Sequence, residues 1–367
     1  MRFVSPALKH VLFPALSGSG YLRYWAPADP AIVTYHGVFP AGYKIRNQAL
    51  DGNLVYADSL RRQLRFLKKR YHVMSPDDFV HWFEGKLSVP PRSILLTCDD
   101  ALRNTLTEMV PILQELGLSC LFFATGASAG DTPSLLWYDE LYLMLLDAKG
   151  TIALKLPEAG VDSGAVASDA RHSCWWNLVE RLSQFDGKFR RELLDQIRDQ
   201  LNLPKSWSGQ FFDDPVLAAR FLTLDIGELR QLTAAGMSVG AHTLSHPILA
   251  RAPEDLAWRE ISESRSVLEK ALGQPIWSFG YPFGNAATVT ARDYRLAKQA
   301  GFRFGFMNFG GRVDAKADRF ALPRIHVTAD MELADFEAHI SGFYDFLRQR
   351  LLGIAEQNLD AGASGTG

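Results

Sequence analysis

Short apolar runs rich in Val, Ile and Phe alternate along the chain with segments in which apolar residues recur every three or four positions. The short runs predict strands, and the periodic segments predict helices. The predicted strands cover residues 31–38, 93–98, 119–126, 237–243, 276–281, 302–309 and 319–327. The predicted helices cover residues 57–70, 76–84, 103–117, 225–236, 254–272 and 288–300. This alternation predicts an α/β fold with a mostly parallel sheet, compatible with a closed (β/α) barrel.

The segment 130–224 interrupts the alternation, because it begins with a long apolar helical pattern and continues as polar helical periods around 175–201. We interpret it as a largely helical insertion between two barrel units, forming a lid or a side domain. The final residues, DAGASGTG, are small and polar and are expected to be flexible. The predicted organisation is an N-terminal arm at 1–30, a barrel domain at 31–352 that contains the insertion, and a tail at 353–367.

The composition narrows the class of protein. Of the 367 residues, 47% are hydrophobic and 22% are charged, and the formal net charge is −2. These values are typical of a globular protein and argue against one that coats nucleic acid, so we expect no nucleic-acid partner. Around the basic run RRQLRFLKKR, the leucines at 60, 64 and 67 share one helical face, which indicates a solvated helix rather than an anion-binding site. Three cysteines without paired spacing give no disulfide framework.

No stretch of the sequence approaches the roughly 20 uninterrupted apolar residues that a membrane-spanning helix needs. The first residues, MRFVSPALKHVLFPALSGSG, have a basic start but lack the sustained apolar core of a signal peptide. We therefore expect a location in the cytoplasm or at the inner face of a membrane. Peripheral association of the arm with that membrane is an open alternative.

Carboxylates and imidazoles stand where two of the predicted strands end. Asp99 and Asp100 follow the run SILLTC, and His242 and His246 follow the run MSVGA. An unpaired carboxylate is costly to bury, so two adjacent ones after an apolar strand imply either a cationic partner or a helix cap. Because the carboxyl ends of parallel strands gather at one face of a barrel, we expect the four side chains to meet there.

Two neutral imidazoles and one carboxylate form a ligand set suited to Zn²⁺, with Co²⁺, Ni²⁺ and Fe²⁺ as alternatives. One aspartate would complete the set, and the other would accept a proton from water activated by the ion. Pro247 disfavours a helix at His246, so a loop is expected to present that imidazole. The alternatives are that the histidines are structural and that Asp100 caps a helix beginning near Leu102. Cys98 is interpreted as a small buried hydrophobic residue rather than a nucleophile.

Four motifs resemble those of the polysaccharide deacetylases of the NodB-homology group, carbohydrate esterase family 4. YHGV, DDALRN, GAHTLSHP and YPFG occur in the order of the family's motifs. TCDDA at 97–101 is similar to the family's T-F-D-D-G, and HTLSH at 242–246 fits its H-[ST]-x-x-H. The resemblance covers residues 31–328 outside the insertion and implies a distorted (β/α) barrel.

The resemblance implies a role for each matched residue. Asp99 is expected to be the general base, and Asp100, His242 and His246 are expected to hold a divalent metal ion, with Zn²⁺ favoured. The backbone N–H of Phe283, in YPFG, is expected to contribute to an oxyanion hole.

A late histidine that protonates the leaving amine in the family is matched by His326. The family's base-orienting arginine is absent, with Gly280 near its place, and Arg324 is the candidate substitute. Ala101 replaces the motif glycine, so a left-handed backbone there would be strained. The family's later Asp/Trp motif has no clear counterpart.

Four further residues are candidates for substrate binding. Tyr281 and Pro282 precede Phe283 in the third motif, and Trp137 offers an aromatic face suited to a pyranose ring. His36, in TYHGV, is expected either to line the site or to end the first strand structurally. For Trp137, the alternative is that it anchors the first helix of the insertion.

The function expected from this resemblance is metal-dependent removal of N-acetyl groups by metal-activated water. The substrate would be an amino-sugar polysaccharide, oligosaccharide or lipid-linked glycan, in the biosynthesis of an exopolysaccharide or of the cell envelope. The alternatives are a catalytically weak or inactive glycan-binding barrel, and a related hydrolase acting as a deformylase or an O-deacetylase.

Overall fold

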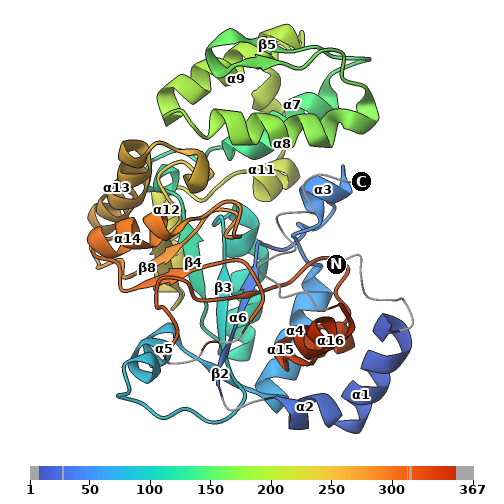
Figure 1. Ribbon diagram of the computed structural model, residues 1–367, viewed down its shortest axis with the longest axis vertical. Coiled ribbons are helices and arrows are strands. Elements are labelled where there is room, and N and C mark those ends of the chain that lie inside the picture. The colour runs from blue at the N-terminus through green and yellow to red at the C-terminus, as the bar shows by residue number, and fades with distance from the viewer. Residues whose placement is uncertain (1–7, 27–28, 312, 314–315, 353–367) are drawn as a thin grey trace.

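A curled sheet of parallel strands forms the centre of the structure, a computed structural model that describes residues 8–26, 29–311, 313 and 316–352 (Figure 1). Seven strands follow the order β10-β1-β3-β4-β7-β8-β9, and β2 pairs with β3 in addition. The strands are β1 (Ala31–Tyr35), β2 (His72–Met74), β3 (Ser93–Cys98), β4 (Leu121–Ala124), β7 (Ser238–Ala241), β8 (Ser278–Gly280), β9 (Phe304–Phe306) and β10 (Ile325–His326). The α/β class and the distorted barrel predicted from the sequence are confirmed.

Helices pack against this sheet. On its outer face lie α4 (Ala57–Arg70), α6 (Val110–Leu116), α12 (Ile226–Ala234), α13 (Glu254–Leu272), α14 (Ala291–Gln299) and α15 (Leu333–Ile340). The helix α5 (Pro76–Phe83) packs on the other face, and α16 (Phe343–Leu352) packs on α15. The bounds of α4, α13 and β3 are those predicted. The strand β2 was not predicted, and the other strands are shorter than predicted at one or both ends.

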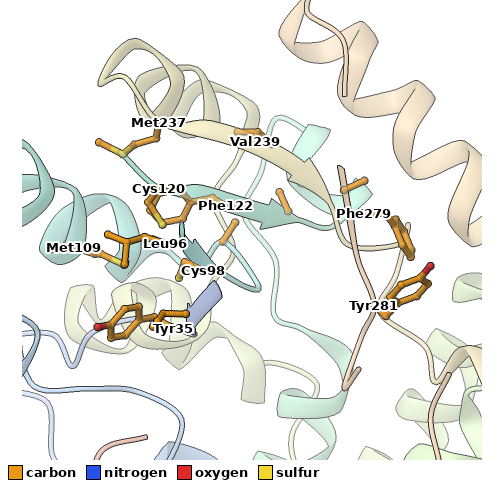
Figure 2. Close-up of a cluster of buried hydrophobic side chains, with 14 of the residues drawn as sticks. Tyr35, Leu96, Cys98, Met109, Cys120, Phe122, Met237, Val239, Phe279 and Tyr281 are labelled. Atoms are coloured by element: carbon orange, nitrogen blue, oxygen red, sulfur yellow. The ribbon is translucent and has the colours of Figure 1, made fainter. Parts of the chain in front are cut away.

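Side chains of successive residues point to opposite faces along a strand, so alternate residues of β3 belong to the hydrophobic clusters on the two faces of the sheet. Leu96 and Cys98 pack outward beneath the helices with Met109 and Cys120 (Figure 2). Leu95 packs on the other face of the sheet with Ile32 of β1 and Phe123 of β4. Burial raises the pKa of the Cys98 thiol well above its ordinary value, which agrees with a structural rather than a nucleophilic role.

The segment 319–326 connects the two edges of the sheet. Leu322 forms a parallel bridge to Phe306 of β9, and Ile325 and His326 pair with β1. The sequence predicted a single strand at 319–327, whereas only its last part joins the ladder of β1. Arg324 lies between these two attachments, so its backbone is held on both sides.

The segment 130–224 folds over the carboxyl end of the sheet, at the top of Figure 1, around a hydrophobic cluster of its own. It contains α7 (Trp137–Asp147), β5 (Lys155–Leu156), β6 (Val161–Asp162), α8 (Arg171–Leu182), α9 (Gly187–Gln200), α10 (Gln210–Asp213) and α11 (Pro215–Phe221). The polar pattern at 175–201 is divided between α8 and α9, because the Asp186 carboxylate accepts the Phe189 N–H and starts a new helix. The division of the chain into arm, barrel and insertion stays a prediction.

The N-terminal arm contains two short helices that the periodicity did not predict, α1 (Phe13–Ser19) and α2 (Tyr21–Trp25). Phe13 and Leu22 are buried with Phe343 and Tyr344, so the described part of the arm packs on α15 and α16. None of the described helices is long and apolar enough to cross a membrane. The predicted tail, 353–367, lies outside the described residues.

Candidate active site

A buried ion pair stands at the end of β3. Arg324 Nη1 donates to Asp99 Oδ1 and Nη2 to Oδ2, both at 2.6 Å, so the guanidinium binds both oxygens of the carboxylate. Arg324 is 0% and Asp99 2% exposed. Arg324 Nε donates to the Met307 carbonyl at 2.6 Å, and Nη1 also lies 3.2 Å from Thr34 Oγ1. The arginine is therefore fixed from three sides.

This pair sets the charge of Asp99. Burial alone would raise the pKa of the Asp99 carboxyl, but the adjacent Arg324 outweighs it and holds that pKa below its ordinary value. Asp99 is thus ionised near neutral pH and carries lone pairs able to accept a proton. His36 Nε2 lies 3.8 Å from Asp99 Oδ2, on the side toward the cavity described below.

Asp100, His242 and His246 form a cluster in which one potential ligand atom from each lies within 4.8 Å of the others. Asp100 Oδ1 is 3.3 Å from His246 Nε2 and 3.7 Å from His242 Nε2. Ligand atoms held about 2.0–2.1 Å from a tetrahedral ion lie roughly 3.3–3.4 Å apart, so these separations fit a metal such as Zn²⁺. Asp100 Oδ1 is also buried without a hydrogen-bond partner, which a bound cation would supply.

The imidazole of His242 is oriented for ligation. Its Nδ1 lies 2.7 Å from the Gly280 carbonyl, to which only a protonated nitrogen can donate, so Nε2 keeps the lone pair directed at the cluster. Burial lowers the pKa of His242 to about 4, which keeps the ring neutral near neutral pH. Neutral imidazole is the form that binds metals.

Left-handed backbone conformations concentrate in the loops of this site. Of the seven described non-glycine residues with positive φ, five belong to the site: Asp100, Ala101, Thr243, His246 and Phe283. Ala101 has φ of 46°, so the chain keeps the left-handed turn without the motif glycine, at a cost of about 1–2 kcal/mol. Because Asp100 belongs to this turn and the helix starts only at Thr105, Asp100 does not cap it.

The insertion helps to hold the loop that carries His246. The Trp137 indole Nε1 on α7 donates to the His246 carbonyl at 3.0 Å. Arg190 Nη1 on α9 donates to the Ser245 carbonyl at 3.2 Å, and the Glu260 carboxylate on α13 accepts the Ser245 N–H at 2.8 Å. Three helices therefore fix the backbone of this loop.

A cavity of about 270 Å³ opens beside the cluster. Of the residues predicted for the site, it is lined by Asp99, Asp100, His242, His246, His36 and Phe283. Phe283 also packs against the ring of His246, with ring centroids 4.9 Å apart.

Three residues predicted to contact substrate do not line this cavity. Tyr281 is 0% exposed, and its ring packs on Phe279 in the hydrophobic core (Figure 2). Pro282 is buried. Trp137 is buried and its indole N–H is used by the His246 carbonyl, as the anchoring alternative predicted. The three residues are buried and are not among the lining residues, so nothing in the cavity supports these substrate assignments, which stay predictions.

His326 is not among the residues that line the cavity. Its ring is next to that of His36, with centroids 4.6 Å apart, and burial together with His36 lowers the pKa of His326 to about 3. His36 is therefore the member of the pair that faces the cavity.

From the insertion, the sequence suggested Asp139 beside Trp137 as a sugar-binding residue, with a role in starting the first helix as the alternative, and Asp139 does line the cavity. The other lining residues of that segment were missed: Tyr138, Tyr142, Trp175, Trp176 and Arg220. The only signal was the local density of aromatic residues, which is equally typical of a helical core.

Comparisons with known proteins agree with this geometry. Residues 218–305 match the sequence model of the polysaccharide deacetylase family, a span that includes both histidines of the cluster and Phe283. No curated protein matches the sequence. Among solved structures, the chain resembles the Streptococcus pyogenes deacetylase PplD in complex with acetate (16% identity, TM-score 0.54, covering 86% of this chain and 99% of that one). It also resembles IcaB from Ammonifex degensii (15%, 0.53, 86% and 98%) and a de-N-acetylase from Aggregatibacter actinomycetemcomitans (14%, 0.52, 84% and 99%). At these identities the likeness concerns the fold.

Replacing Arg324 by Met should lower the free energy of unfolding by about 3–5 kcal/mol, because it leaves the Asp99 carboxylate buried without its partner. Adding Asp99→Asn to Arg324→Met should restore part of this loss, since no buried charge then remains. Urea unfolding measures both, with the exposed Arg295→Met as control. An Arg324→Met protein as stable as the unsubstituted one would contradict the buried pair.

Replacing Trp137 by Phe should weaken Zn²⁺ binding about tenfold, because the His246 carbonyl loses its donor and the loop that presents the imidazole loosens. Competition with a chromogenic chelator measures the affinity. The matched control is Trp207→Phe, since Trp207 is an equally buried tryptophan of the insertion whose indole donates to Asp147 instead. Equal Zn²⁺ affinities for the two variants would show that the insertion does not support the loop.

Proposed function

We propose that this chain, whose residues 218–305 match the polysaccharide deacetylase model, is a metal-dependent hydrolase that removes N-acetyl groups from an amino-sugar glycan. One observation supports this proposal most directly. The carboxylate of Asp99, bound by Arg324, lines the same cavity as the buried cluster of Asp100, His242 and His246. The glycan is a polysaccharide, an oligosaccharide or a lipid-linked form.

Asp100, His242 and His246 would hold the divalent ion, and their oxygen and nitrogen donors suit Zn²⁺ best. When bound, the ion would supply a Lewis acid that acidifies water and polarises the acetyl carbonyl. The remaining steps depend on groups of the chain itself.

Asp99 takes the proton from the attacking water. The two hydrogen bonds from Arg324 fix the carboxylate plane, so this base needs no reorientation during the reaction. The backbone N–H of Phe283, beside His246, is proposed to stabilise the negative charge that develops on the carbonyl oxygen.

The leaving amine must receive a proton, and we assign this step to His36. His36 lines the cavity and lies near Asp99. His326 is not among the lining residues, and its pKa is lowered to about 3. This changes the assignment made from the sequence. His326 then orients His36 through ring contact.

Acetate release from tri-N-acetylchitotriose, measured together with free amine, tests the proposal. Asp99→Asn should lower kcat at least about a thousandfold because the base is lost, and it should keep the metal because Asp100, His242 and His246 are unchanged. His246→Ala should lose both metal and activity. The control is Asp255→Asn, which makes the same change on the exposed face of α13.

Within the same assay, His36→Gln should reduce kcat far more than His326→Gln does. Full activity in Asp99→Asn would overturn the role of the base. Acetate without free amine from acetylated glycans would identify an O-deacetylase, and formate from formylated substrates a deformylase.

A further inference from the structure

One wall of the cavity comes from the insertion and has no role in the chemistry described above. It presents two kinds of group: aromatic rings from α7 and α8, and a pair of charged side chains, Asp139 from α7 and Arg220 from α11. Both kinds lie in the same cavity as Asp100 and His246, so a ligand at this wall would be continuous with one at the metal cluster.

Arg220 is 1% exposed, yet one of its nitrogen atoms is left without a partner. Its Nε donates to Asp51 Oδ1 at 2.9 Å and its Nη2 to the Leu50 carbonyl at 2.8 Å. Nη1 has no hydrogen-bond partner. An unmade hydrogen bond from a buried guanidinium is costly, so an oxygen atom from a ligand would be favourable at this position.

Asp139 stands across from that nitrogen. Its Oδ2 is 4.0 Å from Arg220 Nη1, which is too long for a direct hydrogen bond, and it accepts none from other described residues. A hydroxyl oxygen placed between the two would lie within hydrogen-bond distance of both, at about 2.9 Å from the nitrogen and about 2.7 Å from the carboxyl oxygen. Such a hydroxyl accepts from one partner and donates to the other, as sugar hydroxyls do.

The aromatic part of the wall is rigid. The Trp175 indole donates to the Tyr138 carbonyl at 2.8 Å, and its ring stacks on Tyr142 with centroids 5.0 Å apart. Trp176, next along α8, is half-buried and meets Phe283 edge to face at 5.5 Å. Ordered aromatic faces beside a hydroxyl-sized polar gap are suited to a pyranose ring, which has apolar faces and a polar edge.

We propose that the insertion forms a carbohydrate subsite beside the metal cluster, in which Trp176 supports a pyranose ring and Asp139 with Arg220 binds one of its hydroxyl groups. This inference rests on the proposed function and names residues that bind its substrate.

The test is the binding of tri-N-acetylchitotriose to the full chain carrying Asp99→Asn, which prevents turnover, by isothermal titration calorimetry. Adding Trp176→Ala or Asp139→Asn should raise Kd at least about tenfold. Matched controls are Trp258→Ala and Asp255→Asn on α13, which should leave Kd unchanged.

The proposal is overturned if the Asp99→Asn chain does not bind chitotriose at millimolar concentration, or if both added substitutions leave Kd unchanged. If the unsubstituted chain releases acetate and Asp139→Asn leaves the KM unchanged, the deacetylase activity is supported and the subsite is contradicted. Conversely, if binding depends on Trp176 and Asp139 but the unsubstituted chain releases no acetate, the subsite is supported and the deacetylase activity is contradicted.

Discussion

A carboxylate can remain charged in the interior of this protein because a buried arginine binds both of its oxygen atoms. Asp99 follows the central strand β3, and Arg324 comes from the segment that joins the two edges of the sheet. The pair therefore links local chemistry to closure of the barrel. Without Arg324, burial would favour the neutral acid, and the group would no longer accept a proton near neutral pH.

The helical insertion completes the site in a second way. Its helices contact the barrel where the metal cluster lies, through Trp137 and Arg190 on the backbone of the His246 loop. The same segment supplies the aromatic wall of the cavity. In the proposed reaction, barrel residues would carry the chemistry, while insertion residues hold the loop and line part of the cavity.

Much of the barrel could be predicted because its strands are short apolar runs and its ligands stand directly after them. The exact bounds of β3 and the meeting of Asp100 with His242 follow from this pattern. Arg324 was identified only by its place near His326. The sequence could not show that Tyr281 and Trp137 face inward, because an aromatic residue beside a motif has the same local pattern whether it contacts core or cavity. The proposed subsite depends on contacts between residues far apart in the sequence, such as Trp176 with Phe283 and Arg220 with Asp51. The periodicity of apolar residues does not predict such contacts.

Anomalous diffraction from crystals of the zinc-loaded protein tests the central claim most directly, because it locates the ion and the two aspartates together. The account predicts an ion at about 2.0–2.2 Å from Asp100, His242 and His246, with Asp99 still bound to Arg324 and not to the metal. An ion held by Asp99, or an Arg324 turned away from that carboxylate, would contradict it.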